Sequence, residues 1–186
     1  MFAYCGNNPV NRKDTSGQGW LAALKVVVVI VIIVVVVIVV AEIAKDAIIN
    51  KQEGINPVEK ELAKKDPIGA YKGNKAKEIA NQYQQELYPN TCRKDANQAN
   101  AFKHAMWNAV MTDMIGEERA KQFADAHEEP WLEKQPDLCA MDHYFNEIGR
   151  QIAIQNKGQG YDVFAQKIQE AIKENKEYVI AWDEGN

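Results

Sequence analysis

Residues 26–40 are all valine or isoleucine, and this run constrains the fold more than any other feature of the chain. It lies inside an apolar stretch, residues 20–41, whose one charged residue is Lys25. At about 1.5 Å per residue, a helix of that length reaches roughly 33 Å, enough to cross a hydrocarbon core of about 30 Å. A strand is disfavoured because the run is too long for one and would aggregate in water. We therefore expect residues 20–44 to form a transmembrane or translocation helix that lipid or another protein covers.

The remaining residues have the composition of a soluble domain. Charged residues make up 26% of the chain, the formal net charge is -4 and the pI is about 5.5. We expect no nucleic-acid partner, because the chain lacks the basic excess that binding to phosphate backbones uses. The three cysteines include no C-x-x-C pair, so they indicate neither a disulfide framework nor a zinc knuckle. Cys92 and Cys139 can pair if the chain is exported, but separate thiols are the simpler interpretation.

Apolar residues recur with helical spacing from residue 54 onward, which predicts an all-α bundle. Asn56 can cap the first helix, and Pro57 suits its first position. A linker with a short helix is expected over residues 45–70, and a helical domain over residues 71–186. Residues 177–182 are predicted to form a short strand or to extend the last helix. The helices are expected at 56–64, 75–87, 95–115, 117–128, 136–156 and 161–175.

Polar residues form rows beside the apolar stripes of three predicted helices. Asn100, His104 and Asn108 recur every four residues and so point the same way. Asp142 and Asn146 form a second row, which Gly149 continues; a glycine there lets another backbone or a ligand come close. A third helix carries His127 on its inward stripe, followed by Glu128. Polar groups are costly to bury unpaired, so we expect these rows to meet one another or a ligand.

The residue types in these rows suit general acid–base chemistry. An imidazole titrates near neutral pH, and a carboxylate can fix its tautomer. The candidate catalytic residues are His104, His127, Glu128 and Asp142. A divalent metal is an alternative, with His104, His127 and Asp142 as candidate ligands. The motif H-E-x-x-H is absent, because Trp131 stands where its second histidine would be, and each histidine can equally be a core residue satisfied by a neighbour.

Three further polar residues are candidates for binding substrate. Asn108 and Asn146 would position it, and Arg150 would hold an anionic group such as a phosphate, because a guanidinium forms strong paired hydrogen bonds to such groups. His143 lies off the polar row, and we expect it to be exposed.

The N-terminal segment YCGNNPVNRKDTSG, residues 4–17, resembles the closing motif of the Rhs repeat-associated core. That motif typically runs Tyr-x-x-Asn-Asn-Pro-Val-Asn-x-x-Asp-Pro-x-Gly, and Thr15 departs from its proline. The resemblance implies that residues 1–19 end an Rhs core and that a variable toxin tip follows. The matching residues include Asn7, Asn8, Pro9, Val10, Asn11, Asp14 and Gly17.

A second resemblance covers about residues 70–175. The segments FKHAMWNAVMT, ADAHEE and AMDHYFNEIGRQIA look like three signature segments of an uncharacterised all-helical domain at the tips of Rhs and wall-associated polymorphic toxins. Glu147 departs from an asparagine of that pattern, which puts in doubt any role that needs both amides. The matching residues are His104, Trp107, Asn108, His127, Glu128, Met141, Asp142, Asn146, Gly149 and Arg150.

These resemblances imply an antibacterial effector that is secreted or delivered into a target bacterium, and the Val/Ile run leads us to expect that it associates with a membrane. We expect a hydrolase that acts on a membrane-borne or phosphoester substrate through a His/Glu/Asp site. The alternative is a non-enzymatic toxin that inserts the Val/Ile run and depolarises the membrane. The implied partners are the membrane, a cognate immunity protein, and the parent Rhs shell or a chaperone that covers the run.

Overall fold

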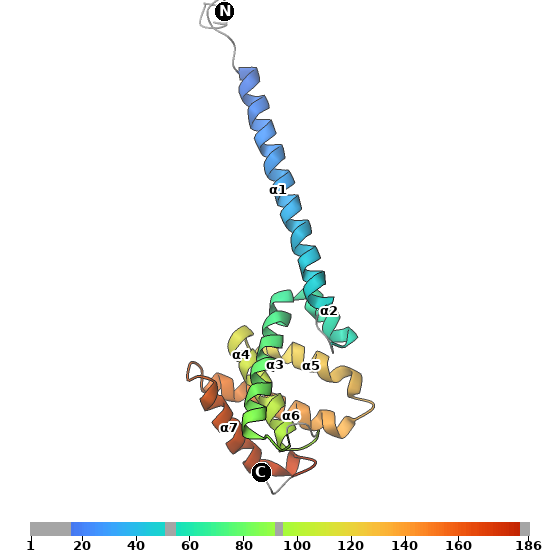
Figure 1. Cartoon of the computed structure of the whole chain (residues 1–186), viewed down its shortest axis with the longest axis vertical. Helices are drawn as coiled ribbons and strands as arrows, with labels where there is room; N and C mark the ends of the chain where they lie inside the picture. Colours follow the sequence, from blue (N-terminus) through green and yellow to red (C-terminus); the bar gives the residue numbers. More distant parts are fainter. Residues whose placement is uncertain (1–15, 51–54, 92–94, 183–186) are drawn as a thin grey trace, which may run out of the picture. The chain divides into compact units, whose positions relative to one another are not determined.

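The computed structural model describes residues 16–50, 55–91 and 95–182. The chain divides into two compact units, Met1–Ile48 and Ile49–Asn186, and each is described by itself. The described residues form helices and connecting turns, so the predicted all-α fold with one N-terminal apolar helix is confirmed (Figure 1).

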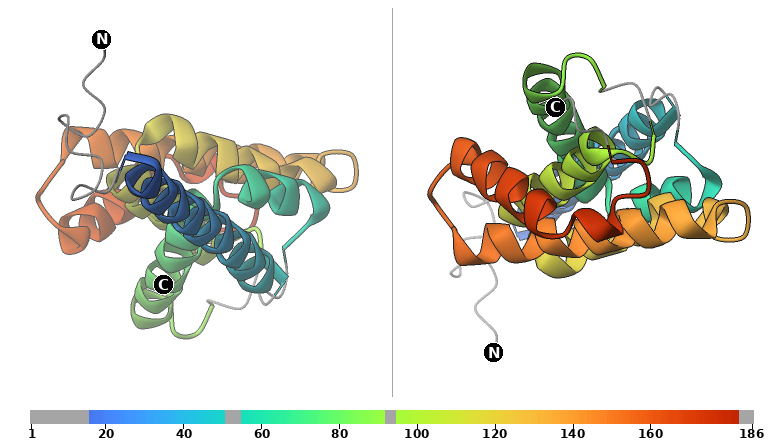
Figure 2. Two further views of the ribbon diagram at one scale, coloured as in Figure 1. Left: turned by 90° about the horizontal axis from the view of Figure 1, so that it is seen from above. Right: turned by 90° about the horizontal axis from the view of Figure 1, so that it is seen from below.

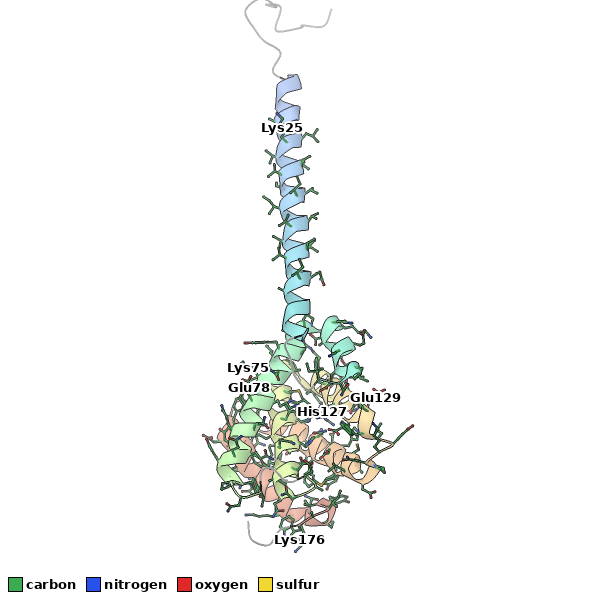
Figure 3. All side chains as sticks on the ribbon, turned by 45° about the vertical axis from the view of Figure 1, so that its right-hand side comes forward. Lys25, Lys75, Glu78, His127, Glu129 and Lys176 are labelled. Carbon is green, nitrogen blue, oxygen red and sulfur yellow. The ribbon has the colours of Figure 1, made fainter. Side chains whose placement is uncertain are left out.

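The described residues of the first unit belong to helix α1 (Ser16–Asn50), whose last two residues are counted in the second unit. Its side chains from residue 22 to residue 44 are all exposed, and Figure 3 shows them projecting from every side of the helix. The segment Ala22–Ala44 is long and apolar enough to cross a membrane. A helix suits this sequence because it satisfies every backbone polar group within the segment, which an apolar solvent requires.

The second unit is a bundle of six α-helices and two 3₁₀ turns among the described residues (Figure 2). Helix α4 is the central helix, because it packs against four others of the bundle, α3, α5, α6 and α7. From Gln98 to Thr112 it is buried except for Lys103, which is half-buried. The elements are α2 (Pro57–Lys65), α3 (Pro67–Leu87), α4 (Gln98–Ile115), α5 (Glu117–Glu128), η2 (Glu129–Trp131), α6 (Pro136–Gln155), α7 (Tyr161–Glu174) and η3 (Lys176–Tyr178).

The start of α2 shows how local sequence positions the bundle. Asn56 caps this helix by accepting hydrogen bonds from the backbone N–H groups of Val58 and Glu59, and Pro57 occupies the first turn, as predicted. The Asn56 amide also donates to the carbonyl oxygen of Ala126 at 2.8 Å. One capping residue therefore ties the start of α2 to the end of α5.

Two sequence-based expectations differ from the structure. Residues 177–182 form no strand: η3 covers Lys176–Tyr178, and one backbone bond follows, from Ala181 N–H to the Ala96 carbonyl. Val179 is buried in the core, so a single apolar anchor explains the pattern that resembled a strand. Helix α3 begins eight residues before the predicted start, because Gly69 and Gly73 interrupt its apolar pattern while leaving room for its neighbours.

Candidate functional site

The polar rows of α4 and α6 meet along the contact between these helices. The Asn100 amide donates to Asp142 Oδ1 at 3.0 Å, and the Asn108 amide donates to Asn146 Oδ1 at 2.5 Å. The Arg150 guanidinium donates to Asn108 Oδ1 at 2.9 Å. We call this set the polar seam. Its members, all buried, are Asn100, His104, Asn108, Asp142, Asn146 and Arg150.

Gly149 allows the two helices to approach closely beside the polar seam. A Cβ atom added at this position would lie 2.0 Å from the carbonyl oxygen of Ala105, so no side chain fits there. The glycine therefore admits another backbone, one of the two roles expected from the sequence. This close approach brings the short polar side chains of the seam within hydrogen-bonding distance.

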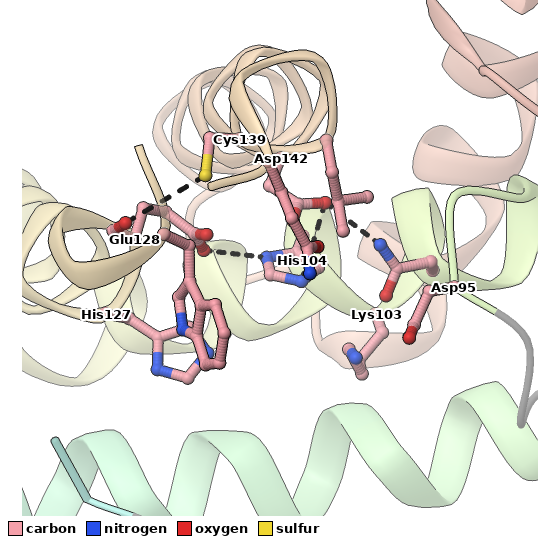
Figure 4. A pocket seen from close by; sticks show the side chains of 11 residues that line it. Asp95, Lys103, His104, His127, Glu128, Cys139 and Asp142 are labelled. Carbon is pink, nitrogen blue, oxygen red and sulfur yellow. Dashed lines mark hydrogen bonds and ion pairs between the residues drawn. The ribbon is translucent and has the colours of Figure 1, made fainter. Parts of the chain in front are cut away.

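Within the polar seam, a histidine is flanked by two carboxyl groups (Figure 4). His104 Nδ1 lies 3.5 Å from Glu128 Oε1, and His104 Nε2 lies 3.6 Å from Asp142 Oδ1. The three residues come from α4, α5 and α6 and are 5%, 3% and 4% exposed. We call them the His104 cluster.

The contacts inside the His104 cluster are too long for ordinary hydrogen bonds. Neither His104 Nδ1 nor Glu128 Oε1 has a hydrogen-bond partner, although both atoms are fully buried. One potential ligand atom from each of the three residues lies within 4.8 Å of the other two. His104 Nδ1 and Glu128 Oε1 thus face each other without forming a hydrogen bond.

A cavity of about 230 Å³ gives access to the cluster. Trp131 and Gln135 are exposed on its wall, so it opens to solvent, while His104, Glu128 and Asp142 form its buried part. The Cys139 thiol, free and buried, also lines it and faces the Glu128 carbonyl oxygen at 3.9 Å. The other lining residues are Asp95, Asn100, Lys103, His127 and Leu138.

Burial favours the neutral form of all three cluster residues, so it raises the pKa of each carboxyl group and lowers the pKa of the imidazole. It raises the pKa of Glu128 to about 8, and the nearby Asp142 carboxyl adds to the effect. It raises the pKa of Asp142 to about 7, against the opposing charge of Lys103. The pKa of the His104 imidazole falls well below 6.5, chiefly through burial and then through Lys103.

His127 lies on the wall of the same cavity but is paired elsewhere. Its Nδ1 lies 2.9 Å from Glu59 Oε1, and its ring packs edge-on against Trp107 with centroids 5.2 Å apart. The His127 and His104 rings are 6.3 Å apart. Of the candidate catalytic residues, the structure therefore brings His104, Glu128 and Asp142 together and sets His127 beside them.

The three expected substrate-binding residues do not line the cavity. Asn108 and Asn146 bond to each other, and the Asn108 amide also donates to the His104 carbonyl oxygen at 3.2 Å. Arg150 is buried, and its guanidinium is engaged by Asn108 and Glu147. Asn108, Asn146 and Arg150 follow the cluster residues at four-residue spacing, so they lie on the same helix faces. They are further along the contact between α4 and α6, where they are buried in the core. In this arrangement they support His104 and do not reach a ligand in the cavity.

Several residues of the site were not among the sequence candidates. Asn100 stands on the row of His104 and Asn108, so its spacing was a usable signal. Lys103 lines the cavity next to His104, but a single lysine on a helix carries no signal of its own. Glu59 could not be found, because nothing in the spacing of α2 indicates that it meets the end of α5.

Two sequence features remain outside the comparison with the structure. Residues 4–15 of the Rhs-like motif lie outside the described residues, as does Cys92. His143 is partly exposed, and its Nδ1 lies 3.7 Å from Asp125 Oδ1, away from the cavity lining.

The fold and the site define an all-α domain in which a buried histidine and two carboxyl groups face a solvent-reachable cavity. Residues 60–176, more than half of the chain, match the family described as "Domain of unknown function (DUF6973)", and the chain belongs to this family. No curated protein and no solved structure matches this chain.

Proposed function

We propose that this chain is the effector part of an Rhs-type polymorphic toxin and that it hydrolyses its target through His104, Glu128 and Asp142. The observation that supports this most is the buried imidazole between two buried carboxyl groups at a cavity. A histidine and two carboxyl groups are costly to bury if they serve only to pack the core, and strongly shifted pKa values are typical of catalytic sites.

The shifted titrations suggest a division of roles. His104 is neutral at pH 7 and can accept a proton from an attacking water, as a general base. Glu128, with a pKa of about 8, is mostly protonated at pH 7 and can donate a proton to the leaving group. Asp142 faces the other ring nitrogen and is held by the Asn100 amide, so it can orient the imidazole.

The charge of the cavity limits the choice of substrate. Asp95 and Asp142 line it against the single lysine Lys103, and Glu128, mostly protonated at pH 7, adds little negative charge. The cavity thus offers no positive excess to an anionic phosphoester, which is disfavoured unless a cation accompanies it. Helix α1 favours a substrate at a membrane. The resemblance of residues 4–17 to the Rhs motif is the basis for proposing a target bacterium, a cognate immunity protein, and the Rhs shell or a chaperone as protein partners.

The second candidate is a toxin that acts through insertion of the Val/Ile run alone. Full exposure of that run on α1 supports insertion. Residues 26–40, however, carry no polar face, and an ion-conducting pore needs polar groups along its lumen. We therefore assign α1 the role of an anchor or delivery segment and keep depolarisation as an outcome of the test.

The test is growth of a bacterial host that expresses the full chain from a tightly repressed promoter, directed to the cytosol or to the periplasm. Replacing His104 with Ala, or Glu128 with Gln, should restore viability at least 100-fold, because each removes a catalytic group. His143→Ala is the matched control and should stay toxic. Toxicity that survives both cluster variants but disappears when Val31 and Val35 are changed to Lys would replace the hydrolase with the membrane-inserting toxin.

A further inference from the structure

We propose that the His104 cluster binds one divalent transition-metal ion, of the Zn²⁺ or Mn²⁺ class, through His104, Glu128 and Asp142. The proposal deepens the hydrolase proposal, on which its catalytic meaning rests, but metal binding itself can be measured without any substrate.

The spacing of the cluster fits a shared ion better than direct hydrogen bonds. Two ligand atoms that each lie about 2.1 Å from an ion, at angles of 90–120°, are about 3.0–3.6 Å apart. The His104 ring makes one contact in this range at each nitrogen, Nδ1 to Glu128 Oε1 at 3.5 Å and Nε2 to Asp142 Oδ1 at 3.6 Å, so an ion on either nitrogen would use one of the two. Three different helices supply the three residues, and one ligand atom from each lies within 4.8 Å of the others.

The imidazole can offer only one ring nitrogen to a single ion. One carboxyl group can ligate an ion beside that nitrogen directly, and the other reaches it through an oxygen turned toward the same nitrogen, as the 4.8 Å limit on the three ligand atoms allows. Asn100 holds one oxygen of Asp142 with an amide donor at 3.0 Å, as outer-shell donors commonly hold metal ligands.

Unpartnered atoms provide a second, independent indication of a ligand. His104 Nδ1 and Glu128 Oε1 are enclosed without a hydrogen-bond partner, in side chains that are 6% and 4% exposed. Leaving such buried atoms unsatisfied destabilises the fold. An ion among the three residues would satisfy the cluster and would also favour the ionised carboxylates that burial now disfavours.

Lys103 is the alternative counter-ion and does not replace the metal. It lines the cavity and acts electrostatically on both carboxyl groups. It forms no ion pair with either of them among the interactions of the described residues. With all three carboxyl groups ionised, as metal binding requires, Asp95, Glu128 and Asp142 carry three negative charges, which a divalent ion together with Lys103 balances and Lys103 alone does not.

The donor set selects the class of ion. One imidazole nitrogen and two carboxylate oxygens suit zinc, manganese and ferrous ions, whereas calcium prefers six to eight oxygens. Three protein ligands also leave positions open toward the cavity, as in catalytic sites and unlike closed structural sites. An ion held there would make its bound water more acidic, which is the chemistry a hydrolase needs.

The experiment is calorimetric titration of Zn²⁺ and Mn²⁺ into the tag-free, chelator-treated full chain in detergent micelles, with bound metal counted by elemental analysis. We expect one ion per chain for the wild type. His104→Gln, Glu128→Gln and Asp142→Asn should each weaken binding at least tenfold. His143→Gln and Asp125→Asn form the matched control, a partly exposed histidine–carboxylate pair on the same domain, and should leave binding unchanged.

Circular dichroism melting separates lost ligands from lost folding. Glu128→Gln removes an ionisable group that burial disfavours, so this variant should melt no lower than the metal-free wild type and still bind poorly. Less than one tenth of an ion per chain, or binding that all three cluster variants retain, would overturn the proposal. Metal binding without toxicity would instead refute the hydrolase, and toxicity that depends on His104 without metal binding would refute only the metal site.

Discussion

Glu128 is a carboxyl group held in a setting that disfavours its charge. Burial and the neighbouring Asp142 raise its pKa to about 8, and its Oε1 has no hydrogen-bond partner. In the folded, metal-free protein this residue keeps its proton at a pH where the unfolded chain has released it. Folding and protonation are therefore linked at this site.

This linkage predicts how the stability of the chelated protein changes with pH. The folded state binds more protons than the unfolded chain at Glu128, so the free energy of unfolding should fall between pH 6.5 and 8. The slope from each group is at most about 1.4 kcal/mol per pH unit. His104, whose pKa is lowered, acts in the opposite direction only below about pH 6.5. Asp142, whose pKa is raised to about 7, acts in the same direction, mainly up to pH 7. Denaturant unfolding should show that Glu128→Gln removes most of the slope from pH 7 to 8; an unchanged slope would contradict the assignment.

Arg150 should act on stability and not on ligand affinity. Its guanidinium is buried against Asn108 and Glu147 and does not line the cavity. Arg150→Met should cost about 2–4 kcal/mol, because it leaves the buried Asn108 Oδ1 without its donor. Thermal unfolding measures this, with the exposed Lys173→Met as the control. A variant that melts normally but loses metal affinity or toxicity would place Arg150 at the ligand after all.

At the scale of elements, the crossing of α4 and α6 depends on Gly149. A Cβ there would meet the Ala105 carbonyl at 2.0 Å, and backbone cannot yield as a flexible side chain can. Gly149→Ala should destabilise the fold by about 1–3 kcal/mol. Gly73→Ala is the matched control: the new methyl group would lie 3.4 Å from the Met111 sulfur, in ordinary contact, so the better helix former should be neutral or stabilising in the same denaturant titration. Equal effects at both glycines would show that the crossing is not tight.

The sequence was informative about this crossing because helix geometry repeats. The four-residue spacing of Asn100, His104 and Asn108, and of Asp142 and Asn146, predicted two polar rows that had to meet something. The spacing could not show which end of the two polar rows faces a cavity. Asn108, Asn146 and Arg150 were therefore expected to bind substrate, and the structure places them in the core. That distinction depends on long-range packing, which local periodicity does not carry.

Features of the fold that depend on residues adjacent in the chain were predictable, and features that depend on contacts between distant residues were not. The capping residue Asn56 and the ends of α5 follow from residues adjacent in the chain. The pairing of Glu59 with His127 joins residues 68 positions apart and has no local signature. The apparent strand after residue 176 reflected one buried residue, Val179, and not a repeating pattern.

At the scale of the whole molecule, the apolar helix and the bundle have separate physical requirements. Among the described residues, the core of the bundle draws on residues from Leu62 to Trp182. A chain shortened to residues 49–186 should therefore fold and remain soluble, with the helical circular dichroism and cooperative melting of a packed domain. Aggregation of this shortened chain, or loss of its cooperative melting, would show that α1 contributes to the core.

The full chain should behave differently, because the exposed Val/Ile run needs an apolar environment. It should sediment with membranes and resist extraction by alkaline carbonate. Changing Val31 and Val35 to Lys should release it, since each buried charge costs about 2.5–3.5 kcal/mol near the centre of a spanning helix. Recovery of the unaltered chain in the soluble fraction would mean that protein, not lipid, covers the run.

The most direct test of the cluster is the nitrogen NMR spectrum of the histidine side chains in the full chain, recorded as a function of pH with and without Zn²⁺. The chain has only three histidines, so single substitutions assign every signal. We predict that His104 stays neutral down to well below pH 6.5 and that, at pH 7.5, one of its ring nitrogens shifts on addition of one equivalent of Zn²⁺, while His143 does not respond. A His104 that titrates like a solvent-exposed imidazole and ignores the metal would contradict the enclosed site on which the proposed chemistry depends.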